Sequence, residues 1–303
     1  MSFAGRLGLV FPQDAIGGSQ AAICDFAQDA QACGFDYLAA AHHDLGLDRD
    51  LHGDTLRRDW PFPETSSMRS APYSAGDAFH EPFVLFGYLS GVCELSFLSA
   101  ALVLPQRQTV AVAKAAAEVD LLSGGRLTLG VGAGWNSTEM TMTGMPWSNR
   151  FARMEEQIHL LRELWTSPNV SFNGQHHRLA GASIRPRPVQ QPIPIWIGSG
   201  SGPHSIDRVA RLADGWMPQQ IPGQELDDAL REIRHLMERS QRDPDSLDLH
   251  GVITVGDADI GCVARRAARW AKAGATYLAL DLRGSLPRHR NTLHRFVDAV
   301  RSS

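Results

Sequence analysis

The sequence predicts an α/β fold, a single (β/α)8 TIM barrel with a long insertion after its second strand. Eight short apolar runs alternate with longer helical stretches, and parallel strands need such helical crossovers. The chain has 303 residues, a length that one barrel fills, and 43% of them are hydrophobic, enough for a large core. A doubly wound open sheet is the alternative, but eight units at this length favour closure.

The expected elements follow one another in regular order. The strands are residues 6–11, 36–41, 95–104, 127–131, 193–197, 215–217, 249–255 and 276–281. The helices are residues 20–33, 110–122, 151–165, 205–212, 224–240, 260–273 and 290–301. Gly34 ends the first of these helices, and Gly124-Gly125 end the second, as glycine commonly does at helix C-termini. We expect residues 1–303 to form one domain.

Two insertions interrupt this order. Residues 45–81 are rich in Asp, Arg, His, Pro and Ser and show little periodicity. They leave the carboxyl end of the second strand, which is the active-site face of a barrel, so we expect them to cover a small-molecule substrate. Residues 169–179 resemble a hairpin that turns at Asn173-Gly174. Within that hairpin, His176 and His177 are expected at the surface.

Composition excludes several classes of protein. The net charge is −4 and no basic stripe with interleaved aromatic residues is present, which argues against a nucleic-acid binder. No segment approaches the roughly 20 apolar residues of a membrane span. The four cysteines form no C-x-x-C pair and fall mostly in helical patterns. The sequence therefore predicts a soluble, cytoplasmic protein.

The loop after the fourth strand is a candidate ligand site. Residues 127–131 form a short buried strand that opens into the small residues Gly132, Ala133 and Gly134. Such a loop lets a ligand approach the backbone closely. Trp135 and Asn136 follow and supply a flat apolar wall and an amide that can donate and accept hydrogen bonds.

A second candidate site follows the fifth strand, in the loop Gly198, Ser199, Gly200, Ser201 and Gly202. The loop leads into a helix expected from residue 205. Free backbone N–H groups and the positive end of that helix would bind an anion, with the two serine hydroxyls as further donors. The alternative is a flexible loop with a serine N-cap.

His42, His43 and Asp44 end the second strand. Adjacent residues on a strand face opposite ways, so we expect His43 to point into the barrel mouth and His42 to pack outward. His43 would then act as a hydrogen-bond donor or acid. A metal site would need His43 together with residues of the insertion, and those spacings match no recognised ligand set. The residues concerned are Asp44, Asp48, Asp50, His52 and His80.

Several motifs occur together in a characteristic order along the chain. They are Gly-Phe-Asp-Tyr-Leu at 34–38, Val-Leu-Pro-Gln-Arg-Gln at 103–108, the segment 120–136, the helix 155–165, Arg-Pro-Val-Gln at 187–190, Pro-Ile-Pro-Ile-Trp-Ile-Gly at 192–198 and Ala-Asp-Gly-Trp at 213–216. In this order they resemble the luciferase-like oxidoreductases, the barrel superfamily of bacterial luciferase and the deazaflavin-dependent enzymes. The Gly-x-Gly-Trp-Asn loop and the long segment after strand two are most similar to the deazaflavin branch.

The resemblance implies a redox enzyme that commonly dimerises, so a homodimer is expected. Its cofactor would be the deazaflavin coenzyme F-420 (F420), with hydride transfer to or from a small organic substrate. The alternative is an FMN-dependent monooxygenase that uses reduced FMN and oxygen. The two reactions differ chemically, because oxygen activation requires the ring nitrogen that a deazaflavin replaces by carbon. A non-catalytic flavin-binding protein and a metal-dependent barrel hydrolase are further alternatives.

The resemblance also implies roles for particular residues. At the end of strand two the family has an acidic residue followed by a histidine near the ring. His42 and His43 occupy these two positions, so the histidine is retained and the acid is replaced. Ser99 and Ala100 occupy the positions at which the family often has a small or hydroxyl-bearing residue and a non-prolyl cis peptide bond behind the ring. The loop 132–136 would line the ring or ribityl chain, and the loop 198–202 would hold the cofactor phosphate.

Overall fold

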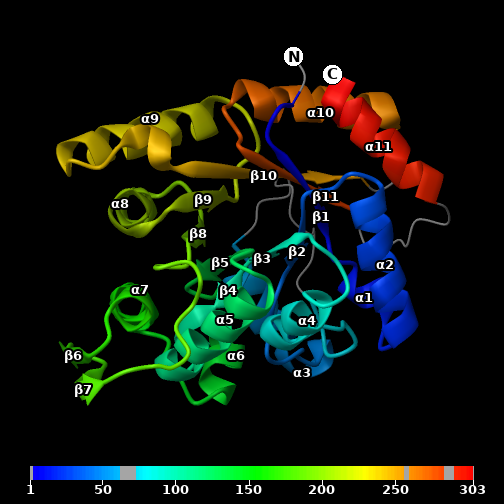
Figure 1. The fold of residues 1–303 in the computed structure, drawn as a ribbon. Helices are drawn as coiled ribbons and strands as arrows, with labels where there is room; N and C mark the ends of the chain where they lie inside the picture. The colour runs from blue at the N-terminus through cyan, green and yellow to red at the C-terminus, as the bar shows by residue number, and fades with distance from the viewer. Residues whose placement is uncertain (1–2, 62–72, 256–258, 283–289, 303) are drawn as a thin grey trace.

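The computed structural model describes residues 3–61, 73–255, 259–282 and 290–302, and within these residues eight parallel strands close into a barrel (Figure 1). The strands are β1 (Arg6–Val10), β2 (Tyr37–Ala40), β3 (Ser96–Ser99) continued by β4 (Leu102–Val103), β5 (Leu127–Gly132), β8 (Ile195–Ser199), β9 (Gly215–Pro218), β10 (Asp248–Thr254) and β11 (Tyr277–Asp281). The order runs from β3 through β2, β1, β11, β10, β9 and β8 to β5, and pairing of β3 with β5 closes the barrel. The predicted fold is confirmed.

Helices surround the strands in Figure 1. They are α1 (Gln13–Ile16), α2 (Gln20–Ala32), α3 (Arg49–Asp59), α4 (Pro82–Leu89), α5 (Thr109–Leu122), α6 (Ser137–Met142), α7 (Arg150–Thr166), α8 (Pro203–Leu212), α9 (Gln224–Arg239), α10 (Ile260–Lys272) and α11 (Arg290–Ser302), with short 3-10 turns at Leu104–Gln106 and Pro244–Ser246. Each predicted helix is present, with ends shifted by a few residues. No helix in the described ranges is both long enough and apolar enough to cross a bilayer.

Large side chains fill the inside of the barrel. Tyr37, Trp196, Met217 and smaller apolar residues form a separate buried cluster there. Glycines on neighbouring strands make room for the two large rings: a Cβ on Gly8 would lie 2.2 Å from the ring of Tyr37, and one on Gly215 would lie 2.5 Å from the ring of Trp196. The barrel is therefore a packed core, and a ligand must bind at one of its ends.

Strand β2 shows which way each of its residues faces. Tyr37 and Ala39 belong to the cluster inside the barrel, whereas Leu38 and Ala40 belong to the cluster between the barrel and its helices. Side chains alternate along a strand, so continuation of this pattern places His43 on the inner side.

The predicted hairpin is formed by β6 (Val170–Asn173) and β7 (Arg178–Ala182), which pair antiparallel. Its histidines lie less freely at the surface than expected. The Nδ1 atom of His177 lies 2.7 Å from Oε1 of Glu156, and its Nε2 atom lies 2.6 Å from Oγ1 of Thr109. The side chain of His177 is 17% exposed, and these two contacts hold the hairpin against α7 and α5.

The four cysteines form no disulfide. Cys33 and Cys93 are buried, while Cys24 and Cys262 are half-buried, so they pack as small apolar side chains.

Candidate functional site

Three small residues, Ala101, Gly132 and Gly198, meet near the carboxyl ends of β3, β5 and β8. A Cβ placed on Gly132 would lie 3.8 Å from the Cβ of Ala101, and one placed on Gly198 would lie 3.6 Å from the same atom. Ala100 and Ala101 pack against the cluster inside the barrel. The packed core therefore ends at this face in a layer of small residues, which we call the floor.

A non-prolyl cis peptide bond joins Ala100 to Ala101 in this floor. The resemblance implies such a bond beside Ser99 and Ala100, and it occurs at that place in the chain. Ser99 is buried and donates its hydroxyl hydrogen to the carbonyl of Gly130 at 2.8 Å. Because a Cβ on Gly130 would lie 1.9 Å from the backbone oxygen of Ser99, β3 and β5 approach each other closely here.

Two residues of the loop after β5 have clear structural roles. Gly134 has φ +82°, and a Cβ there would lie 2.7 Å from Cγ1 of Val103, so both the backbone and the packing require glycine. Asn136 is buried and caps α6, because its Oδ1 accepts the N–H of Glu139 at 3.0 Å. These roles exist whether or not a cofactor lies against the loop.

A buried carboxylate, Glu139, stands at the centre of the site and is only 1% exposed. Its Oε2 atom accepts hydrogen bonds from Nδ1 of His43, at 2.8 Å, and from the hydroxyl of Tyr73. Its Oε1 atom accepts the backbone N–H groups of Asp44, at 2.8 Å, and Leu45, at 3.3 Å. Burial alone would raise the pKa of Glu139, but these donors, His43 above all, hold it below its usual value. Glu139 is therefore an anion with four donors.

The bond to Glu139 determines which proton His43 carries. A carboxylate can only accept, so Nδ1 of His43 carries the hydrogen and Nε2 keeps its lone pair. Burial lowers the pKa of His43 more than Glu139 raises it, which favours the neutral form of the ring. A neutral imidazole that a buried carboxylate holds in one tautomer is the arrangement of a general base.

Aromatic rings surround His43. Its ring centroid lies 3.8 Å from that of Tyr73, 5.1 Å from that of Phe79 and 5.9 Å from that of Trp135. Trp60 contacts Trp135 edge to face, with centroids 4.8 Å apart. Trp60, Phe79 and Trp135 are half-buried, so these rings present flat apolar surfaces beside the imidazole.

His42 lies away from this group, as predicted. Its Nε2 atom lies 2.5 Å from Nη2 of Arg107, which also donates to Oδ1 of Asp44 at 2.9 Å. The same guanidinium pairs with Glu81 at 3.0 Å. Asp44 precedes the insertion and Glu81 is its last residue, so Arg107 connects the two ends of the insertion.

The loop after β8 leads directly into the N-terminus of α8. Gly202 is the N-cap residue and α8 has no side-chain cap. Pro203, the first residue of the helix, has no N–H, and the N–H groups of Ser205 and Ile206 donate to the carbonyl of Gly202 at 2.8 and 3.0 Å. The Oγ atom of Ser199 accepts a hydrogen bond from Nε1 of Trp216 at 3.1 Å. Ser201 donates its hydroxyl to Glu225 at 2.6 Å. The start of α8 thus offers an anion few backbone donors, and the carboxylate of Glu225 opposes an anion.

Glu139, Tyr73, Phe79 and Ala101 belong to the site and were not predicted from the sequence. Glu139 stands three residues after Asn136, which is the pattern of a capping box, so its position could have been recognised but not its contact with His43. Tyr73 lies in the insertion, where no periodic pattern identifies it. No group of three or more His, Cys, Asp or Glu side chains in the described part of the chain is arranged to hold a metal ion.

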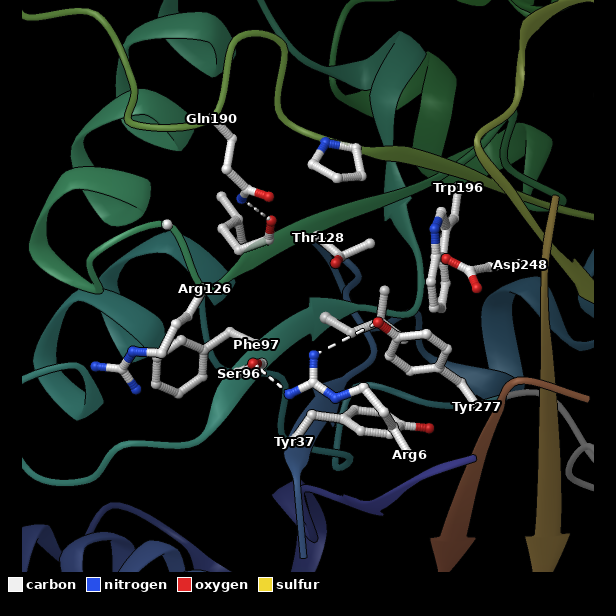
Figure 2. A pocket seen from close by; sticks show the side chains of 14 residues that line it. Arg6, Tyr37, Ser96, Phe97, Arg126, Thr128, Gln190, Trp196, Asp248 and Tyr277 are labelled. Atoms are coloured by element: carbon white, nitrogen blue, oxygen red, sulfur yellow. Dashed lines mark hydrogen bonds between the residues drawn. The ribbon is translucent and has the colours of Figure 1, made fainter. Parts of the chain in front are cut away.

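A cavity of about 110 Å³ lies at the opposite end of the barrel (Figure 2). Arg6, Tyr37 and Tyr277 lie together there, and Nη2 of Arg6 donates to Oγ of Ser96 at 2.8 Å. These residues begin their strands, so this cavity is at the amino-terminal face, where conserved function is rare in barrels. The candidate site is therefore the carboxyl-terminal end with Glu139 and His43.

The sequence matches a known family over nearly its whole length. The profile of the luciferase-like monooxygenases matches residues 8–298. The F420-dependent glucose-6-phosphate dehydrogenase of Amycolatopsis mediterranei is 38% identical over 142 residues, which cover 45% of this chain and 42% of that enzyme. The FMNH(2)-dependent dimethylsulfone monooxygenase of Pseudomonas putida is 29% identical over 174 residues, or 56% of this chain and 48% of that enzyme. The matched stretch thus spans less than half of each relative.

A solved structure shares the fold. It is an F420-dependent secondary alcohol dehydrogenase in complex with an F420-acetone adduct, and it superposes with a TM-score of 0.73 over 98% of this chain and 99% of that chain. The two sequences are 16% identical, so this likeness concerns the fold alone. Together with the match over residues 8–298, the barrel establishes that this chain belongs to the luciferase-like monooxygenase family and is an oxidoreductase.

Proposed function

We propose that this protein is an F420-dependent oxidoreductase that transfers hydride between the deazaflavin and a small alcohol or carbonyl compound. The observation that carries the proposal is the hydrogen bond of 2.8 Å by which the buried Glu139 holds Nδ1 of His43 beyond the carboxyl end of β2. The stretch that is 38% identical to an F420-dependent dehydrogenase supports the choice of cofactor.

The residues at the carboxyl end of the barrel fit a flat ring with an anionic tail. Ala101, Gly132 and Gly198 would lie under the ring, because their small size lets a ligand approach the backbone closely. The loop 198–202 and the uncapped N-terminus of α8 would take the phosphate. F420 would supply the carbon that gives or receives hydride.

His43 would move the proton that accompanies the hydride. In alcohol oxidation its Nε2 atom would accept the hydroxyl proton, and the carbon that bears the hydroxyl would lose its hydrogen as hydride to the bound deazaflavin, which would leave a carbonyl group. In the reverse direction the imidazolium returns the proton to the oxygen. Glu139 would stabilise the transient positive charge on the ring, and the rings of Phe79 and Trp135 would exclude water.

Titration of the purified protein with F420 and with FMN tests the choice of cofactor. We expect saturable binding of F420, followed by its reduction when a panel of small alcohols is added. Failure of F420 to bind at millimolar concentration would contradict the proposal.

A monooxygenase that uses reduced FMN is the second candidate, because the relative from Pseudomonas putida has that activity in its name. Oxygen consumption with reduced FMN, stimulated by an organic substrate, would favour it. In that reaction the same floor and the same phosphate loop would bind the cofactor.

We also propose that two copies of the chain associate through α4 and the end of α5. Val84 is 73% exposed, Tyr88 is 41% exposed and Leu122 is 58% exposed, and these apolar side chains lie on adjacent helices. Light scattering of the wild type and of Val84→Lys tests this proposal: the wild type should have the mass of a dimer and the variant that of a monomer.

A further inference from the structure

We infer that Glu139 is a positioning residue that fixes the tautomer of His43. Tyr73, from the insertion, donates to the same carboxylate oxygen and thereby weakens the interaction of Glu139 with the imidazole. The arrangement makes the basicity of His43 depend on a residue of the insertion. The catalytic consequence rests on the proposed function, whereas the effect on His43 itself does not.

The inference starts from the shared acceptor. Nδ1 of His43, at 2.8 Å, and the hydroxyl of Tyr73 both donate to Oε2 of Glu139, while backbone N–H groups occupy Oε1. A hydrogen bond to a carboxylate disperses its negative charge, so two donors on one oxygen each receive a weaker interaction than one donor alone. Tyr73 and His43 therefore compete for Oε2.

The direction of the Tyr73 hydrogen bond is fixed by its neighbours. Nδ2 of Asn136 donates to the Tyr73 oxygen at 3.0 Å, and Oδ1 of Asn136 accepts the N–H of Glu139. The Tyr73 oxygen is thus already an acceptor, and its hydrogen is directed to Glu139. Burial and the nearby carboxylate raise the pKa of Tyr73, so it keeps its proton and remains a donor.

The charged and titratable groups that face His43 can be named. Glu139 comes from α6 and Tyr73 from the insertion, while His42 and Asp44 flank it in the chain. His42 and Asp44 are engaged with Arg107 on the outer side of β2. Glu139 is therefore the anion in direct contact with His43, and Tyr73 is the other side chain that donates to the same carboxylate oxygen.

This arrangement predicts opposite effects for two isosteric substitutions. Glu139→Gln removes the negative charge that favours the imidazolium, so the pKa of His43 should fall. Its amide can also donate to Nδ1, which would move the ring hydrogen to Nε2. Tyr73→Phe leaves Oε2 to His43 alone, so the pKa of His43 should rise.

The experiment is an NMR titration of the histidine rings in the protein without cofactor, with His43 assigned by the loss of its signals in His43→Asn. Ring nitrogen shifts report the tautomer and proton shifts report the pKa. Glu156→Gln is the matched control, because it removes a similar carboxylate from His177 at 2.7 Å and should leave His43 unchanged. If Glu139→Gln does not fold, Tyr73→Phe alone still tests the inference.

Shifts of the same sign in both variants, or an Nδ1 without hydrogen in the wild type, would overturn the inference. Turnover gives a second readout. We expect Glu139→Gln to reduce kcat on the order of 10²-fold with little change in the KM for cofactor. The acidic limb of its pH profile should follow the lower pKa of His43. Because the titration needs no cofactor, it can succeed even if F420 does not bind.

Discussion

The Nδ1 atom of His43 lies 2.8 Å from the Oε2 atom of Glu139, although 96 residues separate them in the sequence. The end of β2 supplies the histidine and the helix after β5 supplies the carboxylate. Parallel strands bring their carboxyl ends to one face, so the barrel converts two distant segments into one acid–base pair.

Replacement of His43 should separate binding from chemistry. We expect His43→Ala to bind F420 with a dissociation constant close to that of the wild type, while kcat falls by about 10²–10⁴-fold, the usual contribution of a general base. Fluorescence titration and steady-state kinetics measure the two effects. An unchanged kcat would remove His43 from the reaction.

The carboxylate of Glu225 should weaken anion binding at the loop after β8. It accepts the hydroxyl of Ser201 at 2.6 Å and places a negative charge beside the proposed phosphate site. We expect Glu225→Gln to tighten the binding of FMN or F420 by about twofold, as an exposed charge pair contributes little. Calorimetric titration checks this, with Asp228→Gln on the same helix as the control. Equal affinity in all three proteins would indicate that the phosphate lies elsewhere.

Stability should fall in acid because of a histidine inside the barrel. Burial lowers the pKa of His250 to about 3, well below its value in an unfolded chain. Between about pH 3 and pH 6.5 His250 is protonated in the unfolded state but not in the folded state. The free energy of unfolding therefore rises with pH over this range and decreases as the pH falls. One such group contributes a slope of about 1.4 kcal/mol per pH unit.

Denaturant unfolding at pH 4 to 6 measures that slope. In His250→Phe the slope should be smaller by this amount, whatever the absolute stability of the variant. The same slope in both proteins would mean that His250 takes up its proton without unfolding.

Gly134 should tolerate no side chain. We expect Gly134→Ala to destabilise the protein, because φ is +82° and the new Cβ would lie 2.7 Å from Val103. Gly144→Ala is the matched control, since its φ is +78° but no atom lies within 4 Å of an added Cβ. The control should lose about 1 kcal/mol from the backbone alone, and Gly134→Ala should lose clearly more. Equal losses in denaturant unfolding would show that the contact with Val103 relaxes.

The barrel could be predicted because its signals are local. Each strand is a short apolar run next to a glycine or a polar residue, and each predicted helix has an apolar face. Helix α4 gave no such signal, because the sequence Pro82–Leu89 is apolar on nearly every side and lacks periodicity. Helix α3 is mostly charged, and Leu56 is its one buried residue among those described.

The candidate site could be predicted only in part. Strand alternation was enough to place His43 on the inner side, and the glycines after β5 and β8 indicated where the backbone is open. The partner of His43 could not be identified, because contacts between loops of different strands leave no periodic trace in one sequence. The roles predicted for residues 99–100, 132–136 and 198–202 in cofactor binding stay predictions.

The central claim is that His43, held by Glu139, is the base in an F420-dependent hydride transfer. The most direct test is the single-turnover rate of F420 reduction by the best alcohol of a panel, measured across pH for the wild type and for His43→Ala. The account predicts an acidic limb in the wild type at the pKa that NMR gives for His43, and no such limb in the variant. The same limb in both proteins would contradict it.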